Sequence, residues 1–205
     1  MITPLDNTIK GVMNLTWPMI VISVLIISSI RLFDIFKNRK EFCFYKEVMG
    51  LIFMIYVLCL FQVVTFEDPI SVTTSNNFVP FQEIMRYKIG SRLFLKNVIG
   101  NLVMFVPYGI FVSYYVKADN KWNTLFLVTF ASLTIEATQM AIGRVFDVDD
   151  IILNVAGGFV GYLIYYILGR IGSRLPKFMR KSGFLNLLTA ICLGFLLYYV
   201  WMVAK

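Results

Sequence analysis

Three apolar stretches of this sequence carry amide or carboxylate side chains at helical spacing. Their polar residues are Asn97 and Asn101 in the first stretch, Ser132, Glu136 and Gln139 in the second, and Asp147, Asp150 and Asn154 in the third. Residues three, four or seven positions apart lie on one face of a helix. A charged side chain at the centre of a membrane helix costs about 2.5–3.5 kcal/mol, so its presence usually marks a function. We therefore expect these residues to gather around a common site.

The carboxylates of this set are candidates for two kinds of chemistry. Glu136, Asp147 and Asp150 are able to act as general acids or bases, or to bind Mg²⁺ or Ca²⁺ through oxygen atoms. Arg144 lies in the short turn after Glu136, close enough to pair with Glu136 or Asp147. We expect no cofactor, with Mg²⁺ or Ca²⁺ as the alternative. The chain contains no histidine, and no serine or cysteine has a base partner, which disfavours acyl-enzyme chemistry.

A binding site is the other interpretation of the same residues. The predicted ligand-binding residues are Asn97, Asn101, Glu136, Gln139, Arg144, Asp147, Asp150 and Asn154. Structural roles stay open for some of them: Asn97 and Asn101 also suit hydrogen bonds between helices. Asp149 and Asp150 also suit the capping of a helix N-terminus. Glu136 lies deep in its apolar stretch, where function is favoured, whereas Asp149 falls off the polar face and is expected to be dispensable.

The composition places these stretches in a membrane. Of the 205 residues, 59% are hydrophobic and 15% are charged, and the mean hydropathy is +0.75, whereas roughly 25% of a soluble protein is charged. A helix that spans the hydrocarbon core needs about 20 apolar residues. Six stretches qualify, at about 14–31, 47–66, 95–116, 123–142, 150–169 and 184–204. The sequence predicts an all-α transmembrane bundle of five to six helices in one domain, 1–205, and leaves open whether the first stretch spans fully.

The basic residues predict the orientation of the helices. The nineteen Lys and Arg residues lie mainly in short loops, a pattern that orients membrane helices and does not indicate nucleic-acid binding. Loops 31–46, 117–122 and 170–183 contain twelve of them, and the other side contains the remaining seven. We expect those loops in the cytoplasm and both termini outside. Because every polar stripe lies toward the outer end of its helix, we also expect an outward-facing polar pocket between the third, fourth and fifth helices.

The long connection 67–94 predicts a surface element. It contains the run Asn76–Phe81 followed by Gln82–Arg86. Proline between aromatic residues, followed by helix-forming polar residues, is typical of a short interfacial helix. We expect Phe78 and Phe81 to enter the lipid.

Glycine and proline affect two of the predicted helices. Pro107 and Gly109 predict an interruption of the third helix. Gly157, Gly158 and Gly161 lie beside the polar stripe of the fifth helix, where small residues favour close helix packing over ligand contact.

Four motifs in this order resemble the VanZ-like family of bacterial membrane proteins. They are the run Asn77–Phe81, NVIGNLVMFVPYG at 97–109, SLTIEATQ at 132–139 and DVDDIILNVAGGFVG at 147–161. The resemblance covers a core of about 78–170 and implies a bacterial plasma membrane and an association with resistance to teicoplanin-type glycopeptide antibiotics. The family's polar signature corresponds to Asn97, Asn101, Glu136, Gln139, Asp147, Asp150 and Asn154.

Three functions fit these features. The first is a binding or resistance protein whose partner is a lipid-linked peptidoglycan precursor or a lipoglycopeptide. The second is a membrane enzyme that acts on a lipid or glycan headgroup through Glu136, Asp147 and Asp150. The third is a lipid flippase or transporter, which is disfavoured because the cytoplasmic half shows almost no polar residues. The sequence favours binding.

Cysteine labelling tests the predicted topology. In a variant that lacks the three native cysteines, a membrane-impermeant thiol reagent added from outside should label cysteines placed at Ser75 or Val145. It should fail at Asn38 or Ser173 until the membrane is permeabilised, because Lys and Arg keep their loops in the cytoplasm. Labelling at Asn38 in intact cells would reverse the orientation.

Overall fold

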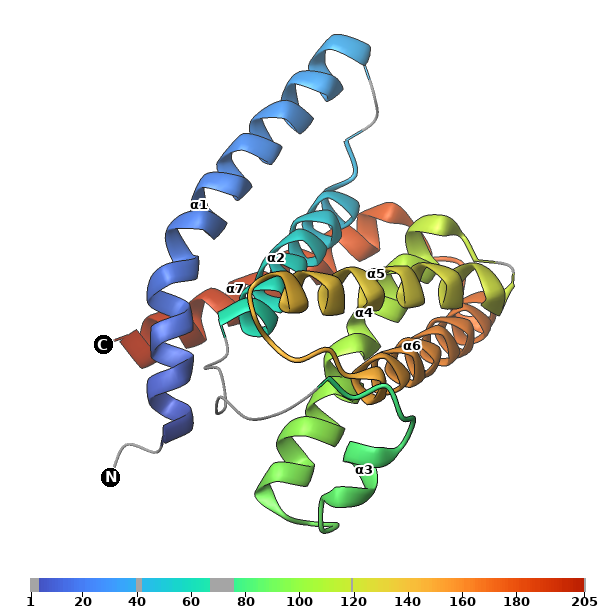
Figure 1. The fold of residues 1–205 in the computed structure, drawn as a ribbon. Helices are drawn as coiled ribbons and strands as arrows, with labels where there is room; N and C mark the ends of the chain where they lie inside the picture. The colour runs from blue at the N-terminus through green and yellow to red at the C-terminus, as the bar shows by residue number, and fades with distance from the viewer. Residues whose placement is uncertain (1–3, 40–41, 67–75, 119, 205) are drawn as a thin grey trace. The chain divides into compact units, whose positions relative to one another are not determined.

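The computed structural model describes residues 4–39, 42–66, 76–118 and 120–204, and these residues are almost entirely helical (Figure 1). The elements are α1 (Pro4–Asn38), α2 (Phe44–Phe66), α3 (Gln82–Arg86), the π-helix η1 (Phe94–Ile99), α4 (Gly100–Val116), α5 (Lys121–Ala141), α6 (Val148–Arg174) and α7 (Ser182–Ala204). Within the described ranges, extended pairing is limited to one isolated bridge between Asn77 and Asp147. The predicted all-α fold class is confirmed.

Among the described residues, six helical segments are long and apolar enough to cross a membrane. They are Trp17–Asn38, Phe44–Val63, Phe94–Val116, Lys121–Ala141, Val148–Arg174 and Ser182–Tyr199. Each of the six predicted stretches overlaps one of these segments, with ends that differ by up to seven residues. The first segment has 22 residues and a mean hydropathy of 2.2, so its length and composition suffice for a full span.

The chain forms two compact units. The first comprises Met1–Leu58 and Arg170–Lys205, and the second comprises Cys59–Gly169. In the first unit, Arg31 of α1 donates two hydrogen bonds to Glu47 of α2, at 2.9 and 3.1 Å. The backbone N–H of Tyr45 donates to Asn186 Oδ1 of α7 at 2.9 Å. These contacts connect the helices of the first unit at their polar ends.

Glycine allows α4, α5 and α6 of the second unit to pack closely. A Cβ atom on Gly157 would lie 2.0 Å from the carbonyl oxygen of Leu102, and one on Gly161 would lie 2.2 Å from that of Val106. A Cβ atom on Gly158 would lie 2.5 Å from Cγ1 of Val128 on α5. The predicted packing role of these glycines is therefore confirmed, since no side chain fits between the backbones.

The expected interruption of the third spanning helix at Pro107 and Gly109 is wrong. Helix α4 continues through Pro107 to Val116, and the irregular part is the π-helical turn η1 at its start. A proline removes one backbone hydrogen bond, which a membrane helix surrounded by other helices tolerates. Gly109 has a different role: a Cβ atom there would lie 2.2 Å from the carbonyl oxygen of Gly158.

A buried hydroxyl pair lies at the other end of this unit. Ser113 Oγ is 2.9 Å from Thr124 Oγ1 and donates to the carbonyl oxygen of Gly109 at 2.6 Å. Both side chains are fully buried. The expectation of almost no polar residues in that half overlooked this pair, which makes one hydrogen bond within α4 and one between α4 and α5.

Candidate functional site

The candidate site begins where α5 ends and α6 starts. Helix α5 ends at Ala141, and the turn that follows contains Gly143, whose φ of +84° is accessible to glycine at low cost. The N–H of Arg144 donates to the carbonyl oxygen of Gln139 at 2.9 Å, which closes the last turn. The short turn returns the chain to Asp147, so the carboxyl end of α5 and the amino end of α6 lie side by side.

Glu136 is the acidic residue of α5, and it is deeply buried. Its side chain is 1% exposed, and Oε2 accepts a hydrogen bond of 3.0 Å from the N–H of Asp147. The first backbone N–H groups of a helix lack intrahelical partners, so this carboxylate satisfies one of the exposed donors at the α6 N-terminus. Arg144 also interacts electrostatically with Glu136. Glu136 therefore faces the protein interior, as the sequence predicts.

Asp147 caps α6 and joins it to the segment before α3. Its Oδ1 atom accepts from the N–H of Asp149 at 2.9 Å and from Asn77 Nδ2 at 2.8 Å. Burial raises the pKa of this carboxyl above its ordinary value, and the two hydrogen bonds partly oppose that rise. Two backbone bonds complete the contact: Asn77 N–H donates to Phe146 and Val148 N–H donates to Asn77, at 2.9 and 3.1 Å.

Asp149 holds the beginning of α3. Its carboxylate accepts from the N–H groups of Phe81, Glu83 (2.8 Å) and Ile84 (3.1 Å), and its side chain is 1% exposed. Phe81 has a φ of 68°, a left-handed conformation that is unusual for a bulky residue. The helical spacing placed Asp149 off the polar stripe, but the expectation that it is dispensable conflicts with these three bonds.

Asp150 points toward α4 and joins the two helices. Its Oδ1 atom accepts a short hydrogen bond from Asn101 Nδ2. Glu136, Asp147 and Arg144 all act on Asp150 electrostatically. Asp149 and Asp150 both lie in the first turn of α6, where acidic side chains are favourable. The side-chain capping bond itself is made by Asp147, and the carboxylates of Asp149 and Asp150 bond to α3 and α4 instead.

Asn154 lies one helical turn below Asp150. Its Nδ2 atom donates to Ser132 Oγ on α5 at 3.0 Å, and its side chain is 4% exposed. Within the described residues, Asn154 Oδ1 is buried without a hydrogen-bond partner. Gln139 is also buried.

Asn97 is a predicted site residue that bonds to a residue outside the predicted set. Its Nδ2 atom donates to the hydroxyl of Tyr87 at 2.8 Å, and it lies within η1. The sequence spacing assumed a regular helix, in which Asn97 and Asn101 share a face. A π-helical turn adds residues per turn and rotates the side chains on either side of it.

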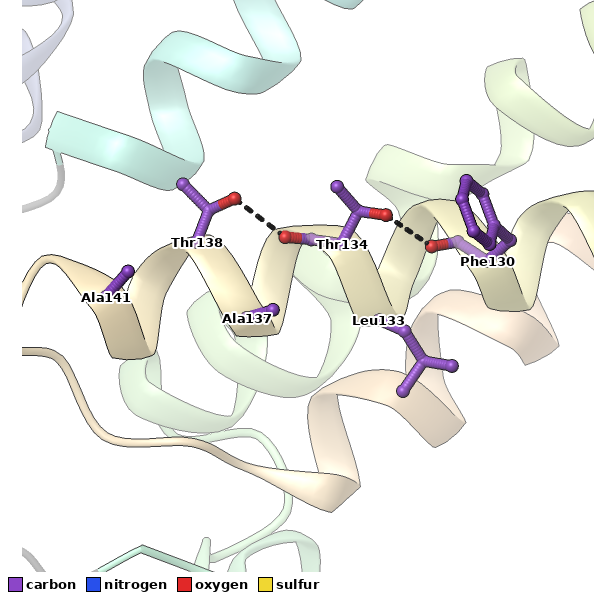
Figure 2. A pocket seen from close by; sticks show the side chains of 6 residues that line it. All are labelled: Phe130, Leu133, Thr134, Ala137, Thr138 and Ala141. Carbon is purple, nitrogen blue, oxygen red and sulfur yellow. Dashed lines mark hydrogen bonds between the residues drawn. The ribbon is translucent and has the colours of Figure 1, made fainter.

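The structure thus brings together Asn101, Glu136, Arg144, Asp147 and Asp150, which we call the polar cluster. Among the described residues, no group of three or more potential metal ligands is placed to hold an ion. A shallow apolar depression of about 500 Å³ lies on α5, lined by Phe130, Leu133, Thr134, Ala137, Thr138 and Ala141 (Figure 2). This face points away from Glu136 on the helix, so the expected polar pocket stays a prediction.

Comparison with known proteins identifies the family. The sequence model of the VanZ/LLP1 family matches residues 53–169, more than half of the chain. The chain belongs to the VanZ/LLP1 family. Protein VanZ of Enterococcus faecium is 33% identical over 72 residues, which are 34% of this chain and 44% of that protein. The match therefore spans less than half of the relative's length, and no solved structure matches the chain.

The VanZ/LLP1 match extends beyond the predicted core. It starts at residue 53 rather than at about 78 and so includes most of the second helix. With the six candidate spans, it makes the chain a multi-pass membrane protein. The match includes Gln62 of α2, a residue that the sequence-based prediction missed. Gln62 is 2% exposed, and its Nε2 atom has no hydrogen-bond partner among the described residues. The sequence feature that could have identified Gln62 is an amide side chain within an apolar run.

Two matched substitutions test the structural roles assigned to Asp147 and Asp149. Asp149→Asn should lower the free energy of unfolding by about 2–4 kcal/mol. Both oxygens of Asp149 accept hydrogen bonds from backbone N–H groups, and in asparagine one of these acceptors becomes an NH₂ donor that faces another donor. Asp147→Asn should cost less than about 1 kcal/mol, because its amide oxygen still accepts from Asn77 and from the N–H of Asp149. Thermal unfolding of the purified protein in detergent, with membrane abundance, measures both. Equal stability of the two variants would contradict the assigned roles.

Proposed function

We propose that this chain is a membrane binding protein whose polar cluster recognises the headgroup of a lipid-linked ligand of the cell envelope. The ligand would be a lipid-linked peptidoglycan precursor or a lipoglycopeptide antibiotic, and binding would contribute to glycopeptide resistance. Membership of the VanZ/LLP1 family supports the resistance context. The supporting geometry is the hydrogen bond between Asn101 of α4 and Asp150 of α6, with the charge of Arg144 near enough to act on Asp150 electrostatically.

The accessibility of the cluster supports binding at Asp150 in particular. Glu136 and Asp149 are almost fully buried, whereas Asn101, Arg144, Asp147 and Asp150 are only partly buried. Glu136, Asp147 and Asp149 each accept hydrogen bonds from backbone N–H groups. These bonds give the three carboxylates a structural role. Asp150 instead accepts a hydrogen bond from the Asn101 side chain. A polar group of a ligand headgroup is able to replace one partner of this hydrogen bond. Glu136 then acts mainly by holding the start of α6 and by its charge.

An enzyme that acts on a lipid or glycan headgroup is the second candidate. The electrostatic coupling of Asp150 to Glu136 and Asp147 favours it, since close carboxylates are the usual acid–base pair of such enzymes. A transporter or flippase has less support, because the buried Ser113–Thr124 pair is already occupied by hydrogen bonds within α4 and between α4 and α5. Turnover of a labelled lipid-linked precursor would distinguish the enzyme from the binding protein.

The side of the membrane is part of the proposal. The ends of α4, α5 and α6 that carry the cluster belong to the side with fewer Lys and Arg residues, seven against twelve. That bias supports an outer position for the cluster. An outer position agrees with ligands that act or accumulate outside the cytoplasm.

Charge removal tests the proposed function. Glu136→Gln and Asp150→Asn should each lower teicoplanin protection to near that of cells without the protein, while membrane abundance stays at the wild-type value. The amide oxygen introduced by Glu136→Gln still accepts from Asp147 N–H, so the fold should be retained. Susceptibility of a teicoplanin-sensitive host, immunoblotting of membranes, and binding of teicoplanin and lipid-linked peptidoglycan precursor to the purified protein are the measurements.

Asp34→Asn is the matched control. Asp34 lies on α1, and Arg31 retains its two bonds to Glu47 when Asp34 is neutralised. This variant should protect like the wild type. Wild-type protection by Glu136→Gln at wild-type abundance would remove Glu136 from the site and leave Asp147 and Asp150 as candidates. Loss of protection together with loss of protein would indicate a structural role only.

A further inference from the structure

The segment Gln82–Lys96 leads into the membrane span that begins at Phe94, and it exposes large apolar side chains ahead of that span. Ile89 is 85% exposed, Met85 is 81% exposed and Leu93 is 55% exposed. All three precede the spanning segment that begins at Phe94. Apolar groups of this size are costly to leave in water, at about 25 cal/mol per Å². At the edge of a membrane span, the interfacial region of the bilayer is the environment that covers them.

The same segment is strongly basic. It contains Arg86, Lys88, Arg92 and Lys96, and Glu83 is its one acidic residue. Glu83 forms an ion pair with Arg86 at 3.0 Å, and the Arg86 side chain is still 66% exposed. Lys88, Arg92 and Lys96 are exposed as well. The segment therefore combines a net positive charge with an apolar surface, which is complementary to an anionic lipid surface.

Hydrogen bonds fix this surface in place. Asp149 accepts from the N–H groups of Glu83 and Ile84, and the Tyr87 hydroxyl accepts from Asn97. Ser91 N–H donates to Lys88 at 2.9 Å, and the hydroxyl of Ser91 accepts from Phe94 N–H at 3.1 Å. The charges consequently lie on an ordered backbone, and binding does not have to order the segment first.

The charge distribution along the chain makes this segment unusual. Four of the seven Lys and Arg residues on the predicted outer side lie in Gln82–Lys96. Basic residues in outer loops oppose the orientation that the other loops favour. An interaction with negative charge at the membrane surface offsets that disadvantage. The complementarity to anionic lipid exists in either orientation, because the bonds that order the segment do not depend on it.

We propose that Gln82–Lys96 is a binding surface for anionic phospholipids. Met85, Ile89 and Leu93 enter the acyl-chain boundary, and Arg86, Lys88, Arg92 and Lys96 contact the lipid phosphates. Each basic residue near an anionic surface contributes up to about a fivefold gain in binding at low salt. This surface is separate from the proposed function of the polar cluster, although the Tyr87–Asn97 bond connects it to η1, directly before α4.

Site-specific photo-crosslinking tests the proposal. A photo-reactive amino acid replaces Ile89 in the full chain, which is reconstituted into vesicles of phosphatidylcholine with a minor fraction of phosphatidylglycerol. Mass spectrometry then identifies the lipid attached. We expect phosphatidylglycerol at position 89 to exceed its mole fraction about threefold or more. The triple variant R86Q/K88Q/R92Q should reduce this enrichment to about one.

Two controls make the result specific. The variant R174Q/K177Q/R180Q removes the same charge from another loop and should leave the enrichment at position 89 unchanged. The same photo-reactive group at Leu187 on α7, which is 61% exposed, should report the bulk lipid composition. If the triple variant does not accumulate, higher salt should abolish the enrichment in the protein with native charges. Phosphatidylglycerol at its mole fraction at position 89, or no lipid attached there, would overturn the proposal.

Discussion

The contact between Asn77–Ile84 and the N-terminus of α6 determines the arrangement of the polar cluster. At this contact, backbone N–H groups of a non-helical segment and of a helix start must be satisfied away from bulk water. Three carboxylates do this together: Asp149 accepts from the α3 start, Asp147 from Asn77 and Asp149, and Glu136 from Asp147. Because each bond orients the group that makes the next one, the acids of α5 and α6 are fixed relative to each other.

The glycines of α4 and α6 set the second requirement. Asn101 reaches Asp150 because the backbones of α4 and α6 approach at Gly157, Gly109 and Gly161, where no Cβ atom fits. The two requirements act at different depths: close packing brings the helices together within the membrane, and the buried carboxylates fix their ends. The partly buried residues Asn101 and Asp150 are thereby held together at the start of α6, which is where the proposed function would have a headgroup bind.

Much of this fold could be predicted from the sequence. Hydropathy and length located the six spans, small residues indicated close packing, and the burial of a carboxylate at Glu136 followed from its depth in an apolar stretch. Asp149 could not be assigned, because its partners are backbone N–H groups 65 to 68 residues away, and helical periodicity contains no information on such donors. The placement of Asn97 was mispredicted for a different reason. Helical spacing assumes 3.6 residues per turn, and the π-helical turn η1 that contains Asn97 does not have this spacing. The helix break predicted at Pro107 is absent, because a membrane helix packed among other helices tolerates the loss of one backbone hydrogen bond.

Hydrogen exchange tests the central contact most directly. We predict that the amides of Phe81, Glu83 and Ile84 exchange slowly in the reconstituted protein, although they lie outside the membrane spans and at the very start of a five-residue helix. Substitution of Asp149 by alanine should release that protection while leaving the interior of α5 protected. Exchange of these amides in the wild-type protein as fast as in an unstructured peptide would contradict the central contact, because Asp149 would then not hold this segment.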